Sequence, residues 1–227
     1  MFLKRFFEDL SKIKNFKLYT QDEVEREHLF LKETKKCILC PERTFPTEFK
    51  KDIFYILLLR NPLDILVSKY YSFGWIHPSN AKNHHNKRIH INFTKQREEI
   101  QKLSIDEYCL NAADELYDKL TPLLENTLDG NNYILIKYDT LVLDFKKWCL
   151  TITDIFDATP DEHDILYSKF KREFENIKEL TPNEIFQGKK RHKRKVIPGD
   201  HLDKLKKETI IKLNKKFKPF LDVFNKL

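Results

Sequence analysis

The stretch LLLRNPLDILVSKYYSF, residues 57–73, changes from one kind of secondary structure to another within a few residues. Its leucines end the apolar run Ile53–Leu59, which is typical of a strand buried on both faces of a sheet. Asn61 and Pro62 suit the N-cap and the first position of a helix. Arg60 stands between the strand and the cap. The sequence therefore predicts a cation at the carboxyl end of a buried strand.

The predicted helix after Arg60 has an apolar face and a polar face. Its apolar residues recur with the spacing that packs a helix on a sheet: Leu63, Leu66, Val67, Tyr70 and Tyr71. Asp64 and Ser68 are four residues apart and share another face. A guanidinium and a hydroxyl on one rim suit a phosphate monoester, so Arg60 and Ser68 are candidate anion ligands. Spacing alone leaves an alternative open, in which Arg60 only forms a salt bridge with Asp64 or Asp52.

The composition is that of a folded protein with a basic surplus. The chain has 227 residues, of which 41% are hydrophobic, so we expect residues 1–227 to form a single domain. Lys and Arg total 42 against 35 Asp and Glu, which gives a net charge of +7, densest at Lys189–Lys195. We therefore expect an anionic partner: a nucleic acid, a membrane headgroup or a phosphorylated small molecule.

The cysteines and the apolar runs predict a cytoplasmic, reducing location. Four cysteines follow no disulfide framework in a chain of this size: Cys37, Cys40, Cys109 and Cys149. We interpret Cys37 and Cys40 as core residues, because no second pair completes a zinc site and alternate side chains of a strand face opposite ways. The longest apolar run is far shorter than the roughly twenty residues that a membrane span needs, and no signal peptide is found.

Strand and helix patterns alternate along the chain. Apolar runs at 37–40, 53–59 and 133–138 predict strands of a parallel sheet. Helical patterns occupy an N-terminal segment (1–35) and residues 63–73, 104–125, 141–157 and 202–224, whereas 78–94 and 181–200 are predicted to be loops. Ser104 is the expected helix cap. This alternation predicts an α/β fold, a parallel sheet flanked by helices and joined by right-handed crossovers.

The segment from Arg60 to Phe73 resembles the 3′-phosphate-binding segment of sulfotransferases that use 3′-phosphoadenylyl sulfate (PAPS). In that family an arginine and a serine stand eight residues apart after a strand, with Asn-Pro and an aspartate between them and aromatic residues following. Arg60, Asp64 and Ser68 match these positions. The resemblance implies a sulfotransferase-like fold related to the P-loop nucleoside triphosphate hydrolases.

Three later segments resemble the same family in the same order. Ser104-Ile-Asp-Glu-Tyr is similar to the helix after the variable loop. Tyr133–Asp139 is similar to a strand ending in Tyr-Glu-Asp-Leu, and Arg194–Asp200 to the Arg-Lys-Gly loop, with Val196 in place of its glycine. The resemblance covers residues 53–227. It implies that the 3′-phosphate of PAPS or of 3′,5′-ADP is bound by Arg60, Ser68, Arg194 and Lys195, and that Tyr138 lies beside the adenine.

Two features of the family are missing. No loop like Pro-Lys-Ser-Gly-Thr-Thr precedes Arg60, and no glycine occurs before Gly74, so a nest of backbone donors for the 5′-phosphosulfate is hard to build. The family's histidine base is replaced by Cys40 within Ile-Leu-Cys-Pro. The substitutes His28 and His77 have no supporting spacing, so we assign no catalytic residue. Arg43, downstream of Pro41, could approach the anion, but nothing in its spacing shows this. The chain is expected to be either a fragment of an active transferase, without its first strand and loop, or a remnant that has lost catalysis.

The expected function is therefore sulfuryl transfer from PAPS to the hydroxyl or amine of a small-molecule or glycan acceptor. A nucleotide-binding remnant without activity is the alternative, and a purely structural role stands behind it. A basic nucleic-acid-binding module, with Lys189–Lys195 as its phosphate-binding surface, is a further alternative. It ranks behind the transferase because no recognition helix or aromatic platform accompanies the basic run. No metal is expected, since His84, His85 and His90 have irregular spacing in a predicted loop. The acceptor and the oligomeric state are not determined.

Overall fold

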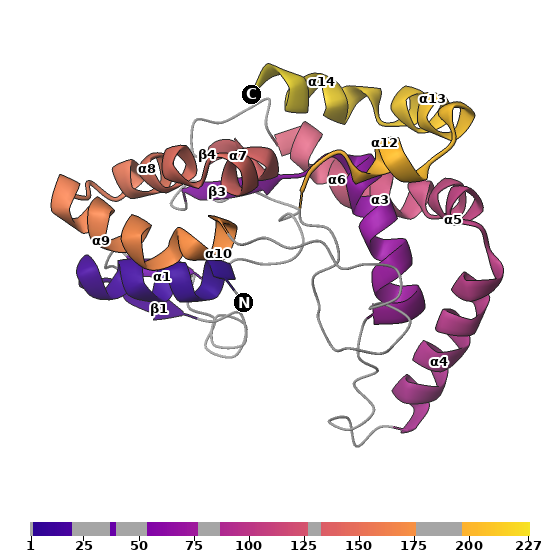
Figure 1. Cartoon of the computed structure of the whole chain (residues 1–227), viewed down its shortest axis with the longest axis horizontal. Helices are drawn as coiled ribbons and strands as arrows, with labels where there is room; N and C mark the ends of the chain where they lie inside the picture. The colour runs from indigo at the N-terminus through magenta and orange to yellow at the C-terminus, as the bar shows by residue number, and fades with distance from the viewer. Residues whose placement is uncertain (1, 20–36, 40–53, 77–86, 127–132, 176–196) are drawn as a thin grey trace. The chain divides into compact units, whose positions relative to one another are not determined.

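The computed structural model describes residues 2–19, 37–39, 54–76, 87–126, 133–175 and 197–227 (Figure 1). The chain forms two compact units, one from Met1–Phe45 with Thr140–Ile177 and the other from Pro46–Asp139 with Lys178–Leu227. Arg60, Ser68 and Tyr138 all belong to the second unit. The candidate site therefore lies within that unit.

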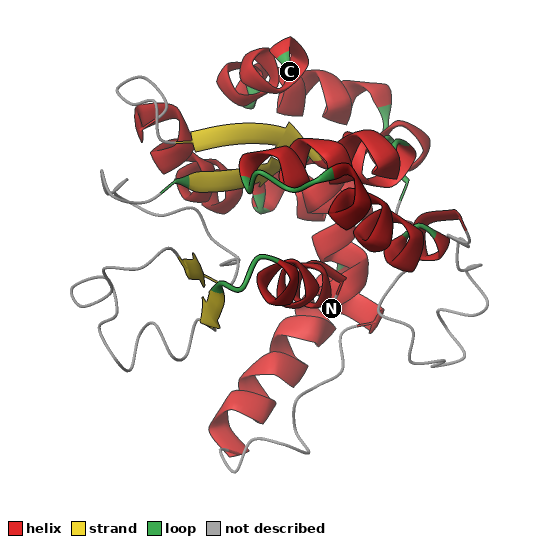
Figure 2. Ribbon diagram, turned by 90° about the vertical axis from the view of Figure 1, so that its left-hand side faces the viewer, coloured by secondary structure: helices red, strands yellow, loops and turns green. Residues whose placement is uncertain are grey.

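The second unit contains a parallel pair of strands, β3 (Tyr55–Leu59) and β4 (Tyr133–Lys137), which lie side by side in Figure 2. Leu59 is in register with Lys137. Both strands were predicted, and the parallel sheet with helices around it confirms the α/β fold class. Because the strands run in the same direction and end in register, the residues that follow them, Arg60 and Tyr138, leave the sheet at the same edge.

Helix α3 (Pro62–Tyr71) follows β3 and is capped by the Asn61 side chain. It continues as a single π-helical turn, η2 (Ser72–Ile76), where the sequence predicted α-helix to residue 73. The predicted helix at 104–125 is two helices, α5 (Ile105–Asn111) and α6 (Ala113–Asn126), with a short break at Ala112. The predicted cap at Ser104 is confirmed, because its hydroxyl accepts from the Glu107 N–H within a complete capping box.

The predicted loop at 78–94 was wrong from Lys87 onward, because the backbone of Lys87–Lys102 forms helix α4. Tertiary contacts explain the difference. Ile100 of α4 is buried, and Arg97 and Gln101 donate hydrogen bonds to backbone carbonyls of η2, at Phe73 (3.1 Å) and Gly74 (2.7 Å). A polar composition predicts a loop, but the contacts with η2 are not visible in the local sequence.

The predicted C-terminal helix at 202–224 is divided into three: α12 (Asp200–Lys204), α13 (Lys207–Lys216) and α14 (Lys218–Lys226). At the first break the Lys206 N–H donates to Asp106 Oδ1 (3.0 Å), so a side chain of α5 satisfies a backbone group that a continuous helix would have bonded internally. At the second break Pro219 stands in the first turn of α14, where its missing N–H does no harm.

The first unit is built from α1 (Phe2–Ile13), β1 (Lys17–Tyr19), β2 (Cys37–Leu39), α8 (Phe145–Ile155), α9 (Pro160–Phe170) and α10 (Arg172–Glu175). Strand β1 pairs with β2 in parallel, so the N-terminal segment predicted to be helical (1–35) also contains a strand, at Lys17–Tyr19. Aromatic side chains from α1, α8, α9 and α10 fill its core: Phe2, Phe6, Phe145, Trp148, Phe170 and Phe174.

The helix predicted at 141–157 also breaks. A short helix, α7 (Tyr138–Leu143), is followed by α8, and the Asp144 side chain caps α8 by accepting from the Lys147 N–H (3.0 Å). Aspartate competes for backbone donors and therefore favours such a cap over the middle of a helix.

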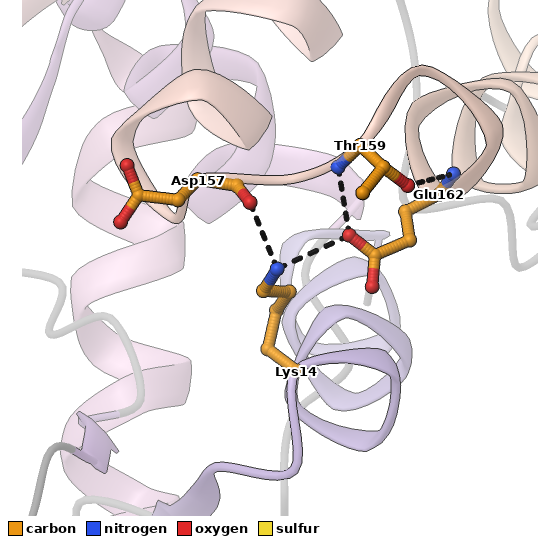
Figure 3. A network of polar contacts seen from close by, with 4 residues as sticks. All are labelled: Lys14, Asp157, Thr159 and Glu162. Atoms are coloured by element: carbon orange, nitrogen blue, oxygen red, sulfur yellow. Dashed lines mark hydrogen bonds and ion pairs between the residues drawn. The ribbon is translucent and has the colours of Figure 1, made fainter.

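A network of polar contacts joins α1 to the start of α9 in the first unit (Figure 3). Lys14 Nζ donates to the Asp157 carbonyl (2.9 Å) and pairs with Glu162 Oε2 (3.1 Å). Glu162 also forms a capping box with Thr159. The same carboxylate therefore caps one helix and contacts the end of another.

Among the described residues, no helix combines the length and the apolar character that a membrane span requires.

Candidate active site

The site begins at the carboxyl edge of β3 and β4, where Arg60 and Tyr138 meet. The Cζ atom of Arg60 lies 4.8 Å from the centre of the Tyr138 ring. At this distance the guanidinium is attracted to the negative face of the ring. Arg60 and Tyr138 each follow the last residue of a strand, as the sequence predicted. In α/β proteins, ligands bind at the edge of the sheet where parallel strands end.

Asn61 and Pro62 direct helix α3 away from this edge. The Leu63 N–H donates to Asn61 Oδ1 (2.9 Å), and Pro62 occupies the first helical position. Arg60 therefore lies at the amino end of a ten-residue helix, where unpaired N–H groups and the helix dipole both favour an anion.

Asp64, in the first turn of α3, holds the C-terminal segment of the chain. Its carboxylate is 1% exposed. It accepts hydrogen bonds from the backbone N–H groups of Gly199 (2.8 Å) and His201 (3.0 Å), and from His201 Nδ1 (2.7 Å). The alternative in which Arg60 pairs with Asp64 was therefore wrong. Both oxygens of Asp64 are used by residues that lie more than 130 positions further along the chain.

Burial and hydrogen bonding act on the pKa of Asp64 in opposite directions. Burial raises its pKa, but the hydrogen bonds from His201 and Gly199, together with the charge of His201, outweigh burial and hold the pKa below the ordinary value. Asp64 is therefore a carboxylate over the whole physiological range of pH.

Gly199 makes the turn that brings the chain to Asp64. Its φ is 89°, in the left-handed region that glycine adopts without strain, and α12 begins at the next residue. Helix α12 packs beside α3 (Figure 1). The turn at Gly199 and the Asp64 carboxylate together hold α12 against α3, the helix that carries Ser68. The start of α12 follows the predicted basic loop in the chain.

Ser68 lies one turn after Asp64 on α3. Residues four apart share a helix face, so Ser68 projects from the same side that contacts the C-terminal segment. Its side chain is half-buried. The structure therefore brings together four elements: the end of β3, the start of α3, the end of β4 and the turn at Gly199.

Asp139 adds a second carboxylate beside Tyr138. Burial raises the pKa of Asp139, and the charge of Asp64 raises it further, although Lys137 and Arg60 oppose this. Its Oδ1 atom is shielded from solvent and has no hydrogen-bond partner among the described residues. Burial likewise raises the pKa of Tyr138. The sequence did not identify Asp139 or His201, because a lone acid or histidine next to a motif carries no spacing signal.

Several residues named from the sequence lie outside the described residues: Arg194, Lys195, His28, His77, Cys40, Arg43 and Asp52. The predicted roles of Arg194 and Lys195 therefore stay predictions. No cluster of three potential metal ligands is found in the part of the chain that the structure describes.

Residues 5–225 of the chain match the sulfotransferase domain family. The match spans nearly the whole chain, and the protein belongs to the sulfotransferase family. It begins upstream of residue 53, so it includes the N-terminal segment as well as the motifs read from the sequence. A comparison with curated proteins gives no significant match.

Proposed function

We propose that this protein transfers a sulfuryl group from PAPS to the hydroxyl or amine of an acceptor and releases 3′,5′-ADP. The observation that carries the proposal is the attachment of Gly199 and His201 to Asp64. This contact brings the chain that follows the basic run to helix α3, which begins two residues after Arg60. Gly199, near the end of the Arg194–Asp200 segment, is thereby joined to Asp64 of the Arg60–Phe73 segment.

The proposed ligand of this edge is the 3′-phosphate of the nucleotide. Arg60 offers a fork of N–H donors that fits a phosphate, and Ser68 offers a hydroxyl on the same helix. Arg194 and Lys195 precede Gly199 by five and four residues, and we propose that they contact the same phosphate. Tyr138 was expected beside the adenine, and its place at the end of β4 is compatible with that role.

The transfer itself is a displacement at sulfur. The acceptor oxygen or nitrogen forms a bond to sulfur while the bond from sulfur to the bridging phosphate oxygen breaks, and the electron pair of that bond leaves with the phosphate of 3′,5′-ADP. The acceptor proton passes to a base or to water. Cations near the departing phosphate favour this step, because they stabilise the charge that develops there. No side chain is assigned as the base.

One observation favours the alternative of a nucleotide-binding protein without transferase activity. The first 73 residues contain no glycine. A loop whose backbone N–H groups surround a 5′-phosphosulfate normally needs glycine for its left-handed positions. Binding of the 3′-phosphate and transfer of the sulfuryl group must therefore be tested separately.

Binding is tested by a thermal-shift and calorimetric titration with 3′,5′-ADP. A ligand that binds only the native state raises the melting temperature, and Arg60→Ala or Ser68→Ala should weaken binding by about tenfold or more. Lys212→Ala and Ser168→Ala are matched controls on exposed positions and should bind like the wild type. Equal binding by Arg60→Ala and wild type would contradict the proposed phosphate site.

Transfer is tested by incubating the protein with PAPS labelled in the sulfuryl group and with phenolic, amine and glycan acceptors. Labelled product that depends on Arg60 supports the transferase. Tight binding of 3′,5′-ADP without any product supports the binding protein. Salt-sensitive binding of RNA or DNA without any response to 3′,5′-ADP would instead support a nucleic-acid partner.

A further inference from the structure

Among the described residues, the contact of Arg60 is with an aromatic ring and not with an acidic side chain. Its Cζ atom lies 4.8 Å from the centre of the Tyr138 ring. Its Nε atom is shielded from solvent and has no hydrogen-bond acceptor among the residues that the structure describes. A guanidinium on a ring face is oriented by the ring's quadrupole, and this interaction uses none of its N–H groups.

Two carboxylates lie close to this pair along the chain, Asp139 directly after Tyr138 and Asp64 four residues after Arg60. Neither takes the donors of Arg60. Asp64 is engaged by Gly199 and His201. Asp139 forms no ion pair with Arg60 in the described part of the chain, and its Oδ1 has no partner there. The donors of Arg60 are therefore kept from both acids.

The register of the sheet makes this arrangement possible. Leu59 of β3 lies opposite Lys137 of β4, so Arg60 and Tyr138 are the next residues of two neighbouring strands. Adjacent strands of a sheet are about 4.8 Å apart, so the side chain that follows one strand can reach the ring that follows its neighbour. Tyr138 is thus placed beside Arg60 by the backbone itself.

We propose that Tyr138 is a positioning residue that fixes the Arg60 guanidinium through its ring face and so sets the affinity for the 3′-phosphate. The inference rests on the proposed function and changes one part of it. The resemblance to sulfotransferases implies that Tyr138 lies beside the adenine, whereas the structure gives one face of its ring to Arg60. The two roles differ in which part of the nucleotide loses affinity when the ring is removed.

The test measures the dissociation constants of 5′-AMP and 3′,5′-ADP. The constant for 5′-AMP divided by the constant for 3′,5′-ADP is the factor by which the 3′-phosphate strengthens binding. Tyr138→Leu removes the ring face and should lower this ratio about tenfold, whereas Tyr138→Phe keeps the face and should hold the ratio within about twofold of wild type. In an Arg60→Ala background, Tyr138→Leu should lower the ratio no further, because Tyr138 acts through Arg60. Tyr138→Met replaces Tyr138→Leu if the leucine variant does not fold.

Each other outcome overturns the inference. If Tyr138→Leu weakens both nucleotides by the same factor, the ring contacts the adenine and the ratio does not change. If it weakens neither, the ring has no role in binding. A wild-type protein that binds neither nucleotide removes the proposed function and this inference together. A wild-type protein that binds both, with a ratio that Tyr138→Leu leaves unchanged, removes the inference alone.

Discussion

The carboxylate of Asp64 and the imidazole of His201 lie 2.7 Å apart in the interior of the second unit, although 137 positions separate them in the chain. Two backbone N–H groups complete the contact, and Gly199 supplies one of them. A buried carboxylate with three donors is well satisfied, and it joins the first turn of α3 to the first turn of α12. This contact commits both Asp64 oxygens to Gly199 and His201.

Removing the Asp64 carboxylate should strongly destabilise the second unit. Asp64→Ala leaves the buried His201 N–H, the partly buried Gly199 N–H and the imidazole of His201 without an acceptor, so we expect a loss of about 3 kcal/mol in the free energy of unfolding. Urea unfolding monitored by circular dichroism measures it. Asp118→Ala removes an exposed carboxylate from the same unit and should cost less than about 0.5 kcal/mol. Similar losses in the two variants would show that the Asp64 contact contributes little.

The two aspartates at the site should respond to pH in opposite directions. The pKa of Asp64 is lowered from its ordinary value of 3.8, so its contribution to stability is present above that pH and is lost as the pH falls through the folded pKa. The pKa of Asp139 is raised, so its contribution is present at low pH and is lost as the pH rises through the folded pKa.

Asp139→Asn should therefore stabilise the protein at neutral pH, by about 0.5–1 kcal/mol, because it removes a partly buried charge close to Asp64. Urea unfolding from about pH 3 to about pH 7 measures both effects. Asp64→Asn should flatten the acid limb of the profile, and Asp139→Asn should not. A stabilising effect of Asp139→Asn only below pH 4 would reverse the expected sign.

The turn at Gly199 should require glycine. Its φ of 89° is costly for any residue with a Cβ atom, so Gly199→Ala should destabilise by about 1–2 kcal/mol. Space is not the reason, because an added Cβ would make ordinary contact with a Leu202 methyl group at 3.8 Å. Gly199→Asn should cost less than Gly199→Ala, since asparagine tolerates this region better. Thermal unfolding of the two variants makes the comparison, and equal costs would argue against a conformational cause.

Cys109 and Cys149 should be unreactive in the native protein. Both are buried free thiols, and burial raises the pKa of each to about 12, so almost no thiolate is present. Thiol labelling near pH 8 should modify neither until a denaturant is added. A Cys37→Ser, Cys40→Ser variant isolates the two buried thiols. Rapid labelling of that variant under native conditions would contradict the burial.

Local sequence predicted the parts of the site that depend on neighbouring residues. The apolar run before Arg60 gave a strand, Asn61 and Pro62 gave the start of a helix, and Ser104 with Glu107 gave a capping box. These features depend on burial and on backbone donors within a few residues of each other. The same reasoning failed at α4, whose carbonyl partners in η2 are far away in the chain.

By itself the sequence determined the strand ends, the helix starts and a sulfotransferase-like pattern, because these features depend on residues that are close together in the chain. Only the tertiary structure decided what Asp64 binds, which face Arg60 rests on, and where the three C-terminal helices break. Those outcomes depend on competition among distant groups for a limited number of acceptors. His201 and Gly199 donate hydrogen bonds to Asp64, and within the described part of the chain the Tyr138 ring, rather than an acid, lies against Arg60.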